Sequence, residues 1–453
     1  MSRFRQLDRA ANANDAGPPL SPLPPATWWA RNRWHLLLAA ALLFYLYVAT
    51  VHALKTPIGA TGFQDAPDEA AHIAYARVVS AGHLPTRENP GTFGSPPQPS
   101  YEWHQPPLYY WLAALCLRSG DKGIRLLSIL IGVAAILTIY RAGRVLLPDR
   151  PAPAALAAGI AALIPGHIAI LSVANNDGLL ELCFSGYLLV LFSSLVNGLT
   201  IKRSILLGCI LGAALLTKST AVLLLPLSVV ALFLIFRRGE SPRSVLQCAI
   251  ILICISFAIS GWWFVRNGVY YHEWLPVTAF KQSFQGTAQA SDIVAGRLGG
   301  LRVDGWAGYA ALVTTWTFQS FFAVYSTERG SQYGVPSFLP PQLYQLSGIV
   351  ALGSSGGLVM AYMRRNTVYS RAQRYAFVIA ITAFVLVAAS FTAFTLRYFQ
   401  AQGRYFYPVM LPITLGGAIG LLSIVPPRYS GVAIGTLLAF LMAFCLAFLR
   451  MTG

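Results

Sequence analysis

The sequence predicts an all-α protein that crosses a membrane about eleven times, and two observations carry this prediction. Hydrophobic residues make up 56% of the 453 residues and charged residues only 11%, whereas soluble globular chains carry about 25% charged residues. The apolar residues also gather in runs of roughly 20, the helix length that spans the hydrocarbon core of a bilayer. So few charges could not cover a soluble globule of this size, but they suffice for a protein whose main solvent is lipid.

Apolar runs place the predicted spanning helices, with bounds good to roughly four residues. They lie at about 34–53, 123–146, 152–173, 177–197, 204–219, 220–237, 244–265, 343–363, 375–396, 405–424 and 430–450. The pair at 204–219 and 220–237 is short and could instead form one broken helix. We find no internal repeat, which argues against transporter folds built from repeated halves.

Loop charges orient these helices. With the N-terminus in the cytoplasm, every loop on that side is net basic, as the positive-inside rule requires. These loops hold Arg141, Arg144, Arg150, Lys202, Arg203, Arg237, Arg238, Arg243, Arg364, Arg365, Arg371, Arg374 and Arg428. Topology therefore accounts for the net charge of +17, and we expect no binding of nucleic acid.

Outside the spans, residues 1–33 are polar and rich in Ala and Pro, which predicts a disordered cytoplasmic tail ahead of one membrane domain at 34–453. Two long outer segments follow, at about 54–122 and 266–342. The first contains two short predicted surface helices, Pro67 to Ala81 and Pro106 to Leu117. In the second, 307–325 is predicted as a re-entrant or surface helix, because a span there would break the charge alternation.

Acidic residues gather on the outer side, where twelve of the sixteen fall. Acidic residues contribute little to topology, so this gathering indicates a use there. Asp68 and His72 lie four residues apart, on one face of a predicted helix. Carboxylates beside a histidine can supply a general base or hold a divalent metal, so Asp68 is a candidate base and Glu69 and His72 are candidate metal ligands. A structural role is equally open, since Asp65 could cap this helix and Pro67 suits its first turn.

Two further motifs on the outer side contain candidate site residues. Asp177, in an Asn-Asn-Asp turn, could cap the next span, yet it falls on the same side as Asp68. The stretch from His104 to Trp111 contains two prolines and three aromatic rings, and it is typical of an aromatic belt at the headgroup level. His104 and Tyr109 are candidates for acceptor binding or structural support.

Three outward cations complete the candidate set: Lys218, Arg266 and Arg404, the last followed by Tyr405 as a further supporting candidate. Lys218 lies in an apolar region, where a charge usually has a partner. These cations could extend to lipid headgroups, or they could hold a phosphate or pyrophosphate.

Taken in order, these motifs resemble the polyprenyl-phosphate-dependent membrane glycosyltransferases of the GT-C fold over about residues 34–425. The resemblance is closest to glycosyltransferase family 39, which includes the protein O-mannosyltransferases, and to the bacterial aminoarabinose transferases of lipid A. The motifs that carry it are Asp68-Glu69, Pro-Pro-Leu-Tyr-Tyr, Asn176-Asp177, Thr217-Lys218, Trp-x-x-Arg266-Asn and Gly-Arg404-Tyr-x-x-Pro.

This resemblance implies an enzyme that takes a sugar from a polyprenyl phosphate at the outer, periplasmic face of a bacterial inner membrane. Its partners would be that donor, membrane lipid, and a glycan, lipid or protein acceptor. The family's proposed base falls on Asp68, its neighbouring acid on Glu69 and its later Asp on Asp177, and transfer would invert the anomeric carbon. The three cations match the family's donor-phosphate residues less closely.

One departure from the family leaves the acceptor open, because the second outer segment has no room for the large soluble domain of some relatives. The alternative function is a lipid-linked-sugar flippase or a small-solute transporter. It predicts charges near the middle of the membrane and repeated halves.

Overall fold

The computed structural model describes residues 28–58, 66–297, 302–325, 336–364 and 368–451. Most of the predicted tail, and the helix-capping role considered for Asp65, therefore lie outside the described residues. The first helix begins at Trp28, several residues before its predicted start.

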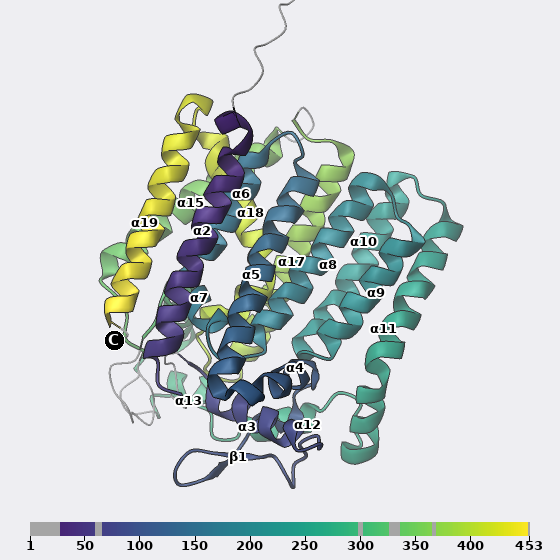
Figure 1. Cartoon of the computed structure of the whole chain (residues 1–453), viewed down its shortest axis with the longest axis vertical. Helices are drawn as coiled ribbons and strands as arrows, with labels where there is room; N and C mark the ends of the chain where they lie inside the picture. Colours follow the sequence, from purple (N-terminus) through teal and green to yellow (C-terminus); the bar gives the residue numbers. More distant parts are fainter. Residues whose placement is uncertain (1–27, 59–65, 298–301, 326–335, 365–367, 452–453) are drawn as a thin grey trace, which may run out of the picture.

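The described residues fold almost entirely into helices, which confirms the all-α prediction (Figure 1). The long helices and their segments are α2 (Trp28–Lys55), α5 (Asp121–Leu146), α6 (Pro151–Ala162), α7 (Pro165–Leu171), α8 (Asp177–Asn197), α9 (Ile201–Leu215), α10 (Leu224–Arg238), α11 (Pro242–Tyr271), α15 (Pro341–Met363), α17 (Arg371–Thr395), α18 (Met410–Ile424) and α19 (Ser430–Met451).

Shorter elements connect them. These are α3 (Glu69–Ser80), α4 (Leu108–Cys116), α12 (Val277–Ser283), α13 (Ala290–Val294), α14 (Gly305–Phe322), and the 3₁₀ turns η1 (Glu102–His104), η2 (Leu117–Ser119), η3 (Ser219–Leu223), η4 (Gly403–Val409) and η5 (Pro427–Tyr429). One antiparallel hairpin pairs β1 (Thr92–Phe93) with β2 (Gln98–Pro99).

Among the described residues, nine helices are long and apolar enough to cross a membrane, or ten if α6 and α7 together form one span. The predicted count of eleven is therefore slightly too high. The difference lies in the 204–219 segment, where α9 has only 15 residues. It is nevertheless a separate helix, packed against α8 and α11, so 204–237 is not one broken helix.

The predicted span at 152–173 is bent by 68° between α6 and α7. Pro165 begins α7 and has no N–H, so it cannot donate to the carbonyl of Ala161 as a helical residue would. The Nδ1 of His167 replaces this donor, at 2.7 Å from the Ala161 oxygen. Nε2 of the same ring lies 2.7 Å from Oε2 of Glu181 on α8, so the break is closed by a buried side-chain pair.

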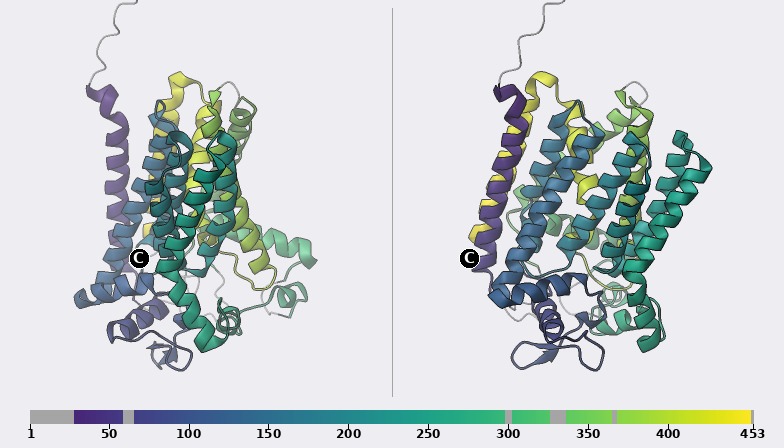
Figure 2. Two further views of the ribbon diagram at one scale, coloured as in Figure 1. Left: turned by 90° about the vertical axis from the view of Figure 1, so that its right-hand side faces the viewer. Right: turned by 45° about the vertical axis from the view of Figure 1, so that its right-hand side comes forward.

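The surface elements gather at one end of the bundle. Helices α3, α4 and α12 lie with the hairpin below the bundle in Figure 1, where α2 ends and α5 begins; we call this the loop end. Figure 2 shows the same arrangement from two further sides. The short helices predicted in the first outer segment are thus present, and the starts of α3, α5 and α8 meet there.

Small residues let α15 and α18 approach closely. A β-carbon added to Gly420 would collide with the carbonyl group of Ser354, and one added to Gly357 would collide with the carbonyl of Gly420. Close backbone approach at glycine is a common means of packing helices in membranes.

We therefore expect Gly420→Ala to lower the free energy of unfolding by about 1–3 kcal/mol, the usual cost of overpacking. Gly417→Ala is the matched control on the same helix, because its β-carbon would meet nothing within 4 Å. It should be neutral or slightly stabilising, since alanine favours a helix. Thermal unfolding of both variants in detergent checks this; equal midpoints for the two would contradict the close approach of the backbones.

Candidate active site

Asp68 occupies the N-cap position of α3 in a left-handed conformation, with φ at 63°. This conformation is costly for a residue other than glycine and is kept only where the surroundings fix it. Two side chains do so here. The Tyr101 hydroxyl donates to Oδ1 at 2.7 Å, and Nη2 of Arg404 donates to Oδ2 at 2.7 Å.

Arg404 also faces a second carboxylate. Its Nη1 lies 3.8 Å from Oδ2 of Asp177, whose Oδ1 accepts a hydrogen bond from Nζ of Lys218. Asp177 begins α8 and is held by a 2.7 Å hydrogen bond from its own N–H to Oδ1 of Asn175. We call Asp68, Asp177, Lys218 and Arg404 the four-charge cluster. Its members come from four separate elements: the start of α3, the start of α8, the turn before η3, and η4.

The charges in this cluster keep Asp68 ionised. Burial raises the pKa of Asp68, but Arg404, His72 and the hydrogen bond from Tyr101 outweigh it and lower the pKa to about 2. At neutral pH the carboxylate is therefore charged and can accept a proton only weakly while Arg404 holds it.

Glu69 is adjacent to Asp68 in the chain but has different partners. Arg125, near the start of α5, donates to both of its carboxylate oxygens at 2.8 and 2.5 Å, and the N–H of Ala174 donates to Oε1 at 2.9 Å. Arg125 and Glu69 are both buried. Both oxygens of Glu69 thus have partners, and the buried ion pair with Arg125 joins α3 to α5; its metal-ligand role stays a prediction.

A different acid, Glu102, lies beside Asp68 and His72. Ligand atoms of Asp68, His72 and Glu102 all lie within 4.8 Å of one another, a spacing that could close around a metal ion. Burial, and to a lesser degree Asp68, raise the pKa of Glu102 to about 8. Glu102 was not singled out from the sequence, and its only signal there was its position two residues before His104.

The remaining candidates surround the cluster. The Tyr109 hydroxyl accepts from the N–H of Asn175 at 2.9 Å, and so supports the turn that carries Asp177. The Nδ1 of His104 lies 3.0 Å from the carbonyl oxygen of Tyr101. The ring of Tyr405 lies 5.7 Å from the Arg404 guanidinium. These contacts suit structural support.

Arg266, the third predicted cation, has its partners outside the cluster. Its Nη2 donates to the carbonyl of Pro85 at 2.8 Å, and its guanidinium lies 4.7 Å from the centre of the Trp263 ring and 5.2 Å from that of Tyr270. Among the described residues, the ion pairs of Asp68 and Asp177 are with Arg404 and Lys218 and do not include Arg266.

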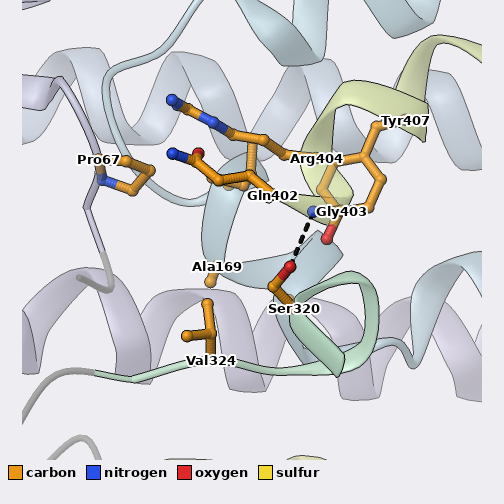
Figure 3. A pocket seen from close by; sticks show the side chains of 10 residues that line it. Pro67, Ala169, Ser320, Val324, Gln402, Gly403, Arg404 and Tyr407 are labelled. Carbon is orange, nitrogen blue, oxygen red and sulfur yellow. Dashed lines mark hydrogen bonds between the residues drawn. The ribbon is translucent and has the colours of Figure 1, made fainter. Parts of the chain in front are cut away.

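A cavity opens beside Arg404 (Figure 3). It is small, with a volume of about 30 Å³. Figure 3 shows Gln402 and Arg404 extending side by side toward Pro67. Apolar side chains line the opposite wall; they include Ala169 and Val324. Such a lining suits a ligand with an anionic end and an apolar body.

Comparison with known proteins shows which proteins this chain is similar to. A family model described as dolichyl-phosphate-mannose-protein mannosyltransferase matches residues 104–263, less than half of the chain. No curated protein sequence matches.

Solved structures match over most of the chain. The apo oligosaccharyltransferase of Archaeoglobus fulgidus is 14% identical, with a TM-score of 0.56, and the match covers 94% of this chain and 56% of that one. ArnT of Cupriavidus metallidurans bound to undecaprenyl phosphate is 15% identical, with a TM-score of 0.53, and the match covers 89% of this chain and 63% of that one. This chain thus spans less than two thirds of either relative. It is a multi-pass membrane protein with the GT-C glycosyltransferase fold.

Proposed function

We propose that this protein transfers a sugar from a polyprenyl-phosphate donor to an acceptor at the loop end of the bundle. One observation carries the proposal: two cations and two carboxylates from distant parts of the chain meet beside a cavity with an apolar wall. The solved ArnT structure binds undecaprenyl phosphate, and a related Archaeoglobus fulgidus structure contains a dolichol phosphate, which supports a lipid phosphate as the donor.

In the proposed reaction, Asp68 is the base and Lys218 and Arg404 bind the donor phosphate. An acceptor hydroxyl or amine attacks the anomeric carbon and inverts it, while the bond between that carbon and the phosphate oxygen breaks. The acceptor proton passes to Asp68, and the electron pair of the broken bond stays on the phosphate, where the two cations stabilise it.

Because of the Asp68–Arg404 pair, the donor would have to bind before Asp68 can act as the base. While Arg404 is bonded to Asp68, the carboxylate is a weak base. A donor phosphate would compete for the same guanidinium, and a hydrogen bond that Arg404 gives to the phosphate in place of Asp68 would raise the basicity of this carboxylate. Asp177 keeps both cations in place. The base would thus become active only when the donor is bound.

The orientation of the protein is also part of the proposal. The loop end carries the acids of the candidate site, whereas the basic loops after α5, α8 and α10 lie at the opposite ends of those helices. By the positive-inside rule the loop end then faces the periplasm of a bacterial inner membrane, and the N-terminus faces the cytoplasm. The acceptor would be a glycan, a lipid or a protein of the cell envelope.

Transfer is tested with the purified protein in liposomes that contain a labelled polyprenyl-phosphate hexose, supplied with an envelope extract as acceptor. Covalent label on a component of the extract supports the proposal. Label that crosses the bilayer without a covalent product would instead indicate a flippase and overturn it.

Donor binding gives a separate prediction. We expect Lys218→Met to weaken binding of undecaprenyl phosphate by roughly 10- to 100-fold, because a charge-assisted hydrogen bond contributes about 1.5–3 kcal/mol. Lys281→Met is the control, since Lys281 is an exposed lysine of α12 at the same end. Titration of each variant with undecaprenyl phosphate in detergent checks this, and equal affinities would remove Lys218 from the donor site.

A further inference from the structure

Near the candidate site the carboxyl groups outnumber the cations, and Glu102 is the carboxyl group without an ion pair. Arg404 pairs with Asp68, and Lys218 pairs with Asp177. Glu102 has no cation of its own among the described ion pairs, although it is only 7% exposed. Its Oε2 has no hydrogen-bond partner in the described part of the chain. A buried carboxylate oxygen without a partner is costly, so the group holds a proton or takes up a cation.

Two other ligand groups lie next to Glu102. One atom each of Asp68, His72 and Glu102 lies within 4.8 Å of the other two. Both Asp68 oxygens have one hydrogen bond, and each keeps a lone pair for a further contact.

One ring nitrogen of His72 has a hydrogen-bond partner. Its Nδ1 lies 2.9 Å from the Tyr110 hydroxyl, and a second ring nitrogen remains for a metal. A hydrogen bond to one ring nitrogen fixes the ring and its tautomer.

We propose that Asp68, His72 and Glu102 form a binding site for one divalent transition-metal ion. The donor set is one imidazole nitrogen and two carboxylate oxygens, which suits Mn²⁺ or Zn²⁺ better than Mg²⁺ or Ca²⁺, the ions that prefer oxygen alone. The catalytic meaning of the site rests on the proposed function: the ion would polarise an acceptor hydroxyl beside Asp68. The binding site itself does not depend on that function.

Metal binding is measured directly on the full-length protein, purified in detergent, stripped with a chelator and titrated with Mn²⁺ alone. Electron paramagnetic resonance of free Mn²⁺ gives the stoichiometry and affinity. We expect one Mn²⁺ per chain, and at least tenfold weaker binding in Glu102→Gln and in His72→Leu. Glu88→Gln, an exposed acid at the same end, is the matched control and should bind as the wild type does.

Wild-type protein that binds no Mn²⁺ stoichiometrically would overturn the proposal, as would unchanged affinity in Glu102→Gln. Glu102→Gln is nearly isosteric and its unfolding midpoint is recorded alongside, so that loss of the fold is not mistaken for loss of a ligand. Transfer is measured in the same preparations. Sugar transfer without metal binding would contradict the metal site alone. Metal binding without sugar transfer would contradict the proposed function alone.

Discussion

Replacing Asp68 by asparagine should reduce sugar transfer by at least 10²–10⁴-fold, the usual contribution of a general base. The amide has nearly the same shape as the carboxylate and can still accept from Tyr101, so the start of α3 should keep its conformation. It cannot, however, take up the acceptor proton. The measurement is the initial rate of transfer at saturating donor, with the unfolding midpoint as a check on the fold.

Asp121→Asn is the matched control for this change. Asp121 lies at the same end of the bundle and pairs with Arg77 at 2.8 Å, but Arg77 is exposed and such a surface pair contributes little. Its transfer rate should stay within about twofold of wild type. Affinity for undecaprenyl phosphate separates two roles of Asp68: Asp68→Asn should bind it no more weakly, because Arg404 loses a competing carboxylate. Full transfer activity in Asp68→Asn would remove this residue from the mechanism.

The spanning helices were largely predictable because each long apolar run has only one stable arrangement in lipid. The bend between α6 and α7 was not predicted, although Pro165 marks its position. An apolar run gives the same signal whether it is straight or bent, and only the missing N–H indicates the break. Helix α9 falls short of a full span because its apolar run is itself short: Lys202 and Arg203 precede it, and Thr217 and Lys218 follow it.

The sequence predicted at which end of the helices the candidate residues lie, but not which of them pair with one another. Loop charges put Asp68, Asp177 and Arg404 at one end, yet 336 positions separate Asp68 from Arg404, and no pattern in one sequence tells which helix ends meet. The neighbours Asp68 and Glu69 point to different partners because Asp68 is the left-handed N-cap of α3, whereas Glu69 is its first helical residue. Sequence adjacency thus favoured Glu69 as a metal ligand, where the structure offers Glu102.

Arg125 has a signal in the sequence that could have revealed its role, since it is an arginine inside the apolar segment 123–146. A charge in such a segment usually has a buried partner. Its partner is Glu69, and its Nη1 also donates to the carbonyl groups of Ala53 and Thr56 at the end of α2. One side chain therefore ties α2, α3 and α5 together.

Arg125→Leu should accordingly lower the free energy of unfolding by about 3–5 kcal/mol, because it leaves the Glu69 carboxylate buried without a counter-charge. Adding Glu69→Gln to this variant should recover part of the loss, since the neutral amide costs less to bury. Recovery would be incomplete, because the carbonyl groups at the end of α2 still lack their donor. Thermal unfolding of the two single variants and the double variant in detergent gives the coupling directly.

Glu69→Gln alone then decides between the two roles considered for this acid. If Glu69 only positions α3, the single variant should be less stable, yet it should transfer sugar at a rate near wild type at a temperature where it is folded. Its amide oxygen can still accept from the N–H of Ala174, so the turn before α8 stays in place. A Glu69→Gln variant with wild-type stability and no transfer would reverse this assignment. It would place Glu69 among the reacting groups, where the resemblance first put it, and leave the buried pair with Arg125 as a feature of the resting state only.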